Sequence, residues 1–163
     1  MSTADELVAA NRSYAEEFES GGLPMPPARK VAVVACMDAR LDTYRLLGLD
    51  LGDAHVIRNA GGVVTDDVIR SLVISQRLLG TEEIVLVHHS DCGMLTFRDD
   101  DVKDQILEET GLRPPFALES FADAADDIRQ SLRRIESDPF IPNKSARGFV
   151  YDVQTGRLNE VQV

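Results

Sequence analysis

The segment VAVVACMDAR, residues 31–40, joins a short apolar run to a polar ending. The run is continuous and rich in valine, which is typical of a strand buried on both faces of a parallel sheet. Further candidate strands lie at residues 54–58, 84–87 and 149–153. A last run at 158–163 follows the turn residues 154–156 and predicts a hairpin, which would add an antiparallel edge strand.

Helical segments are expected between these strands. Thr65, followed by Asp66 and Asp67, is a suitable cap for a helix that extends to residue 79 and stops at Gly80. Apolar residues at helical spacing predict a second helix over 121–135, and a shorter one over 102–109 ends at Gly111. The alternation predicts an α/β fold with a central, mostly parallel sheet of about four parallel strands plus an antiparallel edge strand, flanked by helices.

The N-terminal part of the chain is set apart by its composition. Residues 3–19 are expected to form a helix capped by Thr3, and the glycines and prolines of 21–27 then impose an extended connector. We therefore predict two parts: residues 1–27 as an N-terminal helical arm with a Pro-rich connector, and residues 28–163 as a single α/β domain. Such an arm packs either on a partner subunit or back on its own core.

The charge and hydropathy of the chain exclude several functional classes. Its 163 residues hold 17 Lys and Arg against 28 Asp and Glu, so the formal net charge is −11. A nucleic-acid-binding protein or a polybasic membrane-surface module would need a basic face instead. The longest apolar run, residues 31–37, is far shorter than the ~20 residues of a membrane span. The first residues contain no basic and apolar signal segment, so we expect a cytoplasmic protein.

Residues that carry chemistry follow two of the predicted strands. Cys36 ends the first run, and His89 and Cys92 follow the third with two residues between them. Sites in open α/β sheets form beyond the carboxyl ends of the strands, so we expect these three side chains to meet. Two thiolates and one imidazole make a Cys₂His zinc site with an open fourth position, and sulfur favours zinc over magnesium or calcium. The alternative is a pair of buried, unreactive thiols.

Asp38 and Arg40 stand two and four positions after Cys36, where they can form a bidentate ion pair. One interpretation is an ordinary surface ion pair. In the other, Asp38 lies over the metal, where it accepts a hydrogen bond from a bound water or binds the metal itself and closes the site. Arg40 would decide between these two states by holding Asp38 away from the metal.

Three stretches, CMDAR (36–40), RNAG (58–61) and HSDCG (89–93), resemble the signature stretches of the β-class carbonic anhydrases, of the short, minimal bacterial type. The resemblance implies one zinc ion per chain, held by Cys36, His89 and Cys92. It also implies Asp38 and Arg40 as a catalytic dyad, with Asp38 as a conditional fourth ligand. Subunits of this family pair through the N-terminal arm and the sheet edge, so the resemblance implies a homodimer or a homotetramer.

The implied activity is the reversible hydration of CO₂ to bicarbonate and a proton. Zinc lowers the pKa of a bound water from ~15.7 towards ~7, which gives hydroxide at cellular pH. Because CO₂ is small and apolar, we expect a tight apolar pocket formed by Val63, Val64 and Gly93. Two alternatives remain open. One is a carbonyl sulfide or carbon disulfide hydrolase on the same zinc site, and the other is a non-enzymatic zinc or redox-sensing module with a switch disulfide between Cys36 and Cys92.

Overall fold

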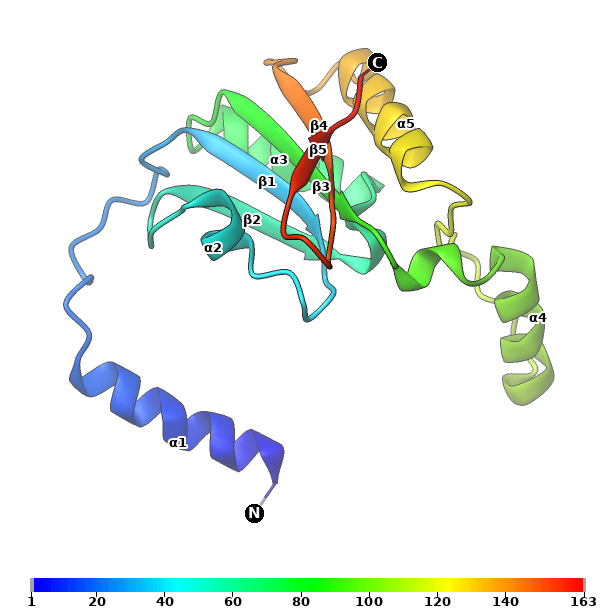
Figure 1. Ribbon diagram of the computed structural model, residues 1–163, viewed down its shortest axis with the longest axis horizontal. Coiled ribbons are helices and arrows are strands. Elements are labelled where there is room, and N and C mark those ends of the chain that lie inside the picture. Colours follow the sequence, from blue (N-terminus) through cyan, green and yellow to red (C-terminus); the bar gives the residue numbers. More distant parts are fainter. Residues whose placement is uncertain (1, 163) are drawn as a thin grey trace.

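A five-stranded sheet forms the centre of the computed structural model, which describes residues 2–162 (Figure 1). In chain order its strands are β1 (Val31–Cys36), β2 (Ala54–Asn59), β3 (Glu83–His89), β4 (Ala146–Tyr151) and β5 (Leu158–Glu160). The first four are parallel, and β5 pairs antiparallel with β4. Across the sheet the order is β2-β1-β3-β4-β5, so β1 and β3 are neighbours although β2 separates them in sequence. The predicted fold class is confirmed.

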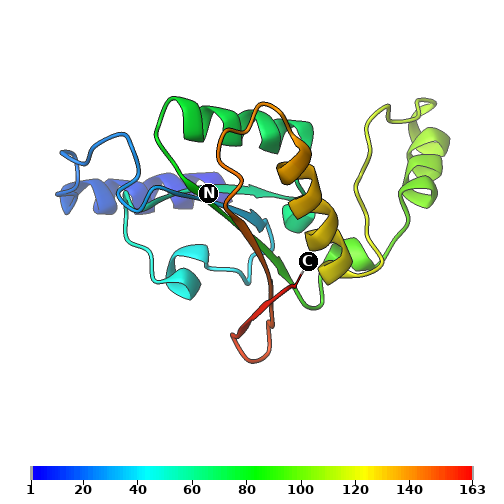
Figure 2. The same ribbon diagram turned by 90° about the horizontal axis from the view of Figure 1, so that it is seen from above.

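Some of the helices cover the two faces of this sheet, and the remaining helices lie away from it. They are α1 (Thr3–Glu16), α2 (Thr43–Leu47), α3 (Asp66–Arg77), α4 (Asp99–Thr110) and α5 (Ala124–Ser137), with short 3₁₀ turns η1 (Ala60–Gly62) and η2 (Gly93–Leu95). Figure 2 shows α3 and α5 on one side of the sheet and α2 on the other. Helices α1 and α4 extend away from the sheet in different directions (Figure 1), and neither contains a buried residue.

Alternate residues of the central strands point into two apolar cores. On β1, Ala32 and Val34 pack in the core shared with α3 and α5, whereas Val33 and Ala35 pack in the core on the other side. All four side chains are at most 1% exposed. This double burial explains why the run contains no polar residue, as expected of a central parallel strand. The second core also contains both cysteines of the chain, so they lie inside the protein.

Several helix boundaries follow the sequence signals. Thr65 caps α3 by accepting a hydrogen bond from the backbone N–H of Val68, and α3 begins at the next residue as predicted. Gly111 follows the last residue of α4 in the left-handed conformation, which is the usual role of glycine at a helix end. These local rules work here because the caps are satisfied by residues close in sequence.

Several helix and strand ends differ from the expected ones by a few residues: α1 ends at Glu16, α5 begins at Ala124 and β5 ends at Glu160. The start of α1 and the presence of α2 also differ from the expectations. The cap of α1 is Ser2 and not Thr3, because Ser2 and Asp5 form a reciprocal capping box. Helix α2, which the sequence pattern did not predict, is only five residues long. It begins with Asp42, whose side chain accepts a backbone hydrogen bond, and it ends at Gly48 in the left-handed conformation.

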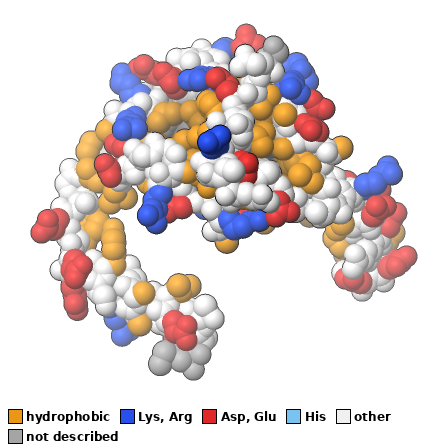
Figure 3. Space-filling view, viewed as in Figure 1, with side chains coloured by type: hydrophobic (Ala, Val, Ile, Leu, Met, Phe, Trp, Pro, Cys, Tyr) orange, Lys and Arg blue, Asp and Glu red, His pale blue; other side chains and the backbone are white. Residues whose placement is uncertain are grey.

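Helix α1 exposes apolar side chains along its length, as Figure 3 shows for the projecting N-terminal segment. Leu7, Val8 and Tyr14 are each more than half exposed. The division into an arm (1–27) and an α/β domain (28–163) stays a prediction. Within residues 2–162, no helix combines the length and the hydropathy needed to cross a membrane.

Candidate metal centre

The carboxyl ends of β1 and β3 carry two of the predicted ligands. Cys36 is the last residue of β1, His89 is the last residue of β3, and Cys92 immediately precedes η2. The two strands are paired in register, so they end at the same edge of the sheet. The ligand atoms of the three residues lie within 4.8 Å of one another, and all three residues are buried. The structure thus brings together the three side chains that the spacing predicted to meet.

Glycine at position 62 lets the chain pass close behind Cys36. Gly62, at the end of η1, has φ of +73°, in the left-handed region. A Cβ atom here would lie 2.8 Å from the backbone nitrogen of Cys36 and 2.9 Å from the carbonyl carbon of Ala35. Only glycine satisfies both the dihedral angle and the space. This close contact supports the end of β1, where the first ligand lies.

The side chain of His89 is oriented for coordination. Its Nδ1 lies 2.8 Å from the backbone carbonyl of Ser90, which can only accept, so Nδ1 carries the proton and Nε2 has the free lone pair. Among the described residues Nε2 has no hydrogen-bond partner, although it is buried. The Sγ atoms of Cys36 and Cys92 are 4.0 Å apart, close to the ~3.8 Å expected of two sulfurs that bind one tetrahedral zinc ion. These residues therefore fit a zinc ion, which would satisfy the unpartnered nitrogen.

The two thiols differ in their electrostatic surroundings. Burial raises the pKa of Cys92 to about 11, because a thiolate would be poorly solvated there. Burial also disfavours the thiolate of Cys36, but the adjacent imidazole of His89 and nearby backbone N–H groups outweigh it and lower the pKa of Cys36. A divalent cation between the sulfurs would stabilise both thiolates, since a coordinating thiol is deprotonated.

Asp38 is held by Arg40 at the rim of the ligand cluster. Nε and Nη2 of Arg40 donate to Oδ1 and Oδ2 of Asp38 at 2.9 and 2.8 Å, and the backbone N–H of Arg40 donates to Oδ1 at 2.9 Å. These bonds hold the pKa of Asp38 well below its usual range, so the carboxylate is ionised at neutral pH. Its Oδ2 lies 3.6 Å from Nε2 of His89. The carboxylate therefore faces the cluster while it remains bound to Arg40.

A cavity of about 320 Å³ is lined by both cysteines of the cluster. Its wall consists of Cys36, Met37, Asp38, Ala60, Gly61, Cys92, Gly93, Met94 and Phe97. Gly93, one of the predicted pocket residues, is part of this wall. Val63 lies behind the wall, next to Gly61, whereas Val64 belongs to the core on the α3 side of the sheet. The roles of Val63 and Val64 in a substrate pocket stay predictions.

Known proteins resemble the chain over nearly its whole length. The sequence profile described as carbonic anhydrase matches residues 31–158. "Beta-carbonic anhydrase 1" of Mycobacterium tuberculosis is 64% identical over 162 residues, which cover 99% of each chain. The chain belongs to the β-carbonic anhydrase family. A crystal structure of carbonic anhydrase from Streptococcus mutans matches it with a TM-score of 0.93 and 43% identity over 99% of each chain. A carbon disulfide hydrolase of Saccharolobus solfataricus is 33% identical over 96% of this chain and 87% of its own.

Membership in the β-carbonic anhydrases confirms the family that the three motifs indicated, and with it the prediction of a carbonic anhydrase enzyme. The motifs were informative because two of them carry the ligand cluster and follow neighbouring strands. The third motif, RNAG, follows β2 into η1 and supplies Gly61 to the cavity wall.

In this β-carbonic anhydrase, Arg58 supports the first metal motif in a way that sequence reasoning missed. Its Nε and Nη2 donate to the carbonyl of Cys36 at 3.0 and 2.8 Å, and Nη2 also donates to the carbonyl of Asp38 at 2.7 Å. Arg58 thereby holds the backbone between the first ligand and the dyad. The position of Arg58 in the RNAG stretch indicated that it is important. Its role could not be predicted, because it binds backbone carbonyl groups, which every residue carries.

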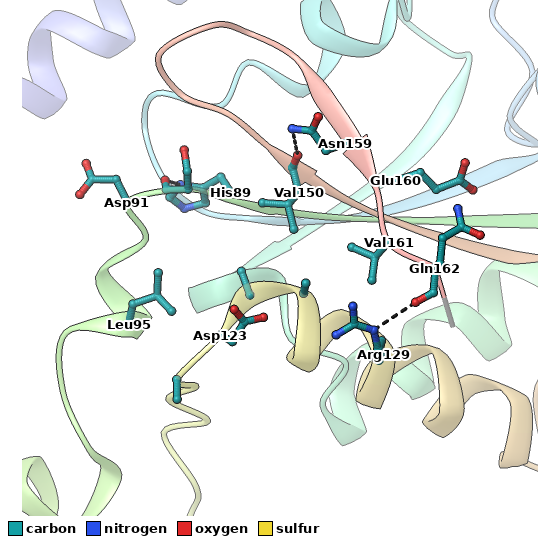
Figure 4. A pocket seen from close by; sticks show the side chains of 14 residues that line it. His89, Asp91, Leu95, Asp123, Arg129, Val150, Asn159, Glu160, Val161 and Gln162 are labelled. Carbon is teal, nitrogen blue, oxygen red and sulfur yellow. Dashed lines mark hydrogen bonds between the residues drawn. The ribbon is translucent and has the colours of Figure 1, made fainter.

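A larger hollow of about 710 Å³ lies beside His89, between β5 and the start of α5 (Figure 4). Figure 4 shows Asn159 and Glu160 on the side of β5 and Arg129 on α5, where Arg129 donates to the carbonyl of Gln162 at 3.0 Å. The two cysteines and Asp38 line the smaller cavity instead. The smaller cavity is therefore the one that contains most of the side chains predicted to carry the chemistry.

Proposed function

We propose that this protein catalyses the reversible hydration of CO₂ to bicarbonate and a proton, with one zinc ion per chain on Cys36, His89 and Cys92. The observation that carries the proposal is a buried cluster of three ligands beside a carboxylate, Asp38, that is bound to Arg40. Three protein ligands leave a fourth position for water, as in catalytic zinc sites, whereas structural zinc sites use four. The 64% identity to a β-carbonic anhydrase supports the same activity.

The roles of the dyad follow from its geometry. Zinc, when bound, would lower the pKa of a water towards ~7 and so supply hydroxide at neutral pH. Asp38 is ionised and faces the cluster, so it accepts a hydrogen bond from the incoming water and directs the oxygen lone pair towards CO₂. Arg40 keeps this carboxylate at the rim. An Asp38 carboxylate released from Arg40 would be able to hold the metal as a conditional fourth ligand, which would close the site.

The cavity has the chemistry that CO₂ requires. Met37, Met94 and Phe97 give it an apolar wall, and Gly93 adds no side chain to it. Such a wall holds a small apolar molecule without hydrogen bonds. It disfavours the charged product, because a buried charge without a partner is costly, so bicarbonate should leave readily.

Stopped-flow CO₂ hydration on zinc-loaded and metal-free protein tests this function. We expect hydration only in the zinc-loaded protein, and the rate should rise with pH as the attacking water loses its proton. Absence of metal-dependent hydration at every pH between about 7 and 9 would refute the proposal.

Hydrolysis of carbonyl sulfide or carbon disulfide is a second candidate activity. It is favoured by relatives named carbon disulfide hydrolase, which are 33–35% identical over most of this chain. The metal ligands would be the same, so the choice depends on which molecule enters the cavity. Turnover of carbonyl sulfide and carbon disulfide, measured on the same zinc-loaded sample, decides between the activities.

A redox-sensing module without enzymatic activity is less well supported. The two sulfurs are 4.0 Å apart and would need only a short movement to form a disulfide after loss of the metal. Such a module has no use for the bidentate pair of Asp38 and Arg40 beside the ligands. CO₂ hydration in the assay above would exclude it as the main function.

We also propose that the protein assembles as a homodimer or homotetramer in the cytoplasm. The support is helix α1, which buries none of its own residues and exposes Leu7, Val8 and Tyr14. An exposed apolar face of this kind marks an interaction surface. Light scattering should give at least twice the mass of one chain, and a monomeric mass would contradict the assembly.

A further inference from the structure

One carboxylate close to the ligands has no part in the reaction described above. Asp91 lies between His89 and Cys92, and its backbone has φ of +54°, which is uncommon for a residue other than glycine. In this conformation both its side chain and its carbonyl contact Arg40. Nη1 of Arg40 donates to Oδ2 of Asp91 at 2.7 Å, and Nη2 donates to the backbone carbonyl of Asp91 at 2.9 Å.

Arg40 is therefore held between two carboxylates. Its Nε and Nη2 bind Asp38, while Nη1 and Nη2 bind Asp91. The N–H groups of a guanidinium point in fixed directions within one plane, so a contact at one edge orients the other edge. Asp91 thus orients the guanidinium group of Arg40 towards the carboxylate of Asp38. It also links the loop that contains His89 and Cys92 to the loop that follows Cys36.

We propose that Asp91 is a positioning residue that keeps Arg40 on Asp38 and so keeps the Asp38 carboxylate away from the metal. This role rests on the proposed function, because it needs a metal with an open fourth position. The side chain of Asp91 is 78% exposed, and exposed ion pairs typically change an equilibrium constant by a factor of about 1.5 to 5. Loss of Asp91 therefore shifts the balance between the two positions of Asp38 without abolishing either.

Two substitutions at this position separate its contacts. Asparagine and glycine both tolerate the left-handed backbone. Asp91→Asn removes the charge and keeps one acceptor, whereas Asp91→Gly removes the side chain and leaves the carbonyl for Arg40. Asp67→Asn is the matched control, since it removes a carboxylate from an exposed pair with Arg70 on α3.

Each protein is loaded with Co²⁺ in place of zinc and titrated with thiocyanate, an anion that binds to an open metal position. The absorption of Co²⁺ reports both the binding and the ligand set. We expect Asp91→Gly to weaken thiocyanate binding about two- to fivefold, because Asp38 then competes more often for the metal. Asp91→Asn should weaken it less, and Asp67→Asn should match the wild type.

The direction of the change separates positioning from simple electrostatics. Removing a negative charge near the metal would by itself tighten the binding of an anion, which is the opposite result. In an Asp38→Asn background, Asp91→Gly should no longer weaken binding, because the competing carboxylate is gone. Unchanged or tighter binding in Asp91→Gly overturns the role of Asp91 alone. A wild-type protein that binds neither Co²⁺ nor thiocyanate refutes the proposed function, and the positioning role with it.

Discussion

Replacing Gly62 by alanine should weaken the fold and the ligand cluster together. The new Cβ would lie 2.8 Å from the nitrogen of Cys36, 2.9 Å from the carbonyl carbon of Ala35 and 3.1 Å from the carbonyl oxygen of Val87. All three are backbone atoms of β1 and β3, so none can rotate away. The left-handed dihedral costs about 1 kcal/mol, and overpacking costs a further 1–3 kcal/mol or so. We therefore expect the free energy of unfolding to fall by about 2–4 kcal/mol.

The assay is urea denaturation followed by circular dichroism, because the chain has no tryptophan. Gly80→Ala is the matched control: Gly80 has φ of +74°, and a Cβ there would meet no atom within 4 Å. It should lose only the dihedral cost, about 1 kcal/mol, and keep its affinity for zinc. Gly62→Ala should also bind zinc more weakly, because Cys36 must move. Equal stability losses and equal zinc affinities in the two variants would refute the reasoning.

Three further predictions concern single side chains. Cys36→Ala, His89→Ala and Cys92→Ala should each lose zinc, and metal analysis that still finds one zinc per chain would contradict the ligand set. Asp38→Ala should keep zinc but slow CO₂ hydration by roughly 10²-fold, whereas wild-type kinetics would remove its assigned role. Burial acts against the ionised form of Asp99, but N–H groups of residues 118–120 outweigh it and lower the pKa of Asp99 to about 2. Because this pKa is depressed in the folded state, the hydrogen bonds from the N–H groups of residues 118–120 to Asp99 should stabilise the fold fully above about pH 4. This stabilisation should be lost as the pH falls through 2. Hydrogen exchange at those amides is the measurement, and protection unchanged at low pH would argue against it.

The central strands and the ligand cluster could be predicted for a shared physical reason. Strands β1 and β3 are largely buried on both faces, so each contains a continuous apolar run, residues 31–36 and 84–87, that is easily recognised. Cys36 and His89 each end one of these strands, and neighbouring parallel strands end at one edge of a sheet. The strand assignments, together with the two-residue spacing between His89 and Cys92, therefore predict the position of the cluster.

The remaining parts depend on conformations that a sequence pattern does not encode. The contact of Asp91 with Arg40 needs a left-handed backbone at a residue other than glycine. Helix α2 is too short to show a helical period in its sequence. Its residues Leu46 and Leu47 pack against the core that contains both cysteines, and this packing is not encoded by local helix propensity. The side chain of Val64 packs in the core on the α3 side of the sheet. The backbone is extended at Val63, directly after η1, and this local conformation is not visible in the sequence pattern.

The predicted metal ligands lie far apart along the chain, since Cys36 and Cys92 are separated by 56 positions. A cation that binds both sulfurs acts as a removable cross-link between the end of β1 and the segment after β3. Like a disulfide, it closes a long loop and restricts the unfolded chain. Removal of the metal with a chelator should therefore lower the melting temperature of the protein. In the metal-loaded protein, the hydrogen-bonded pair of strands β1 and β3 should be the last part of the sheet to separate.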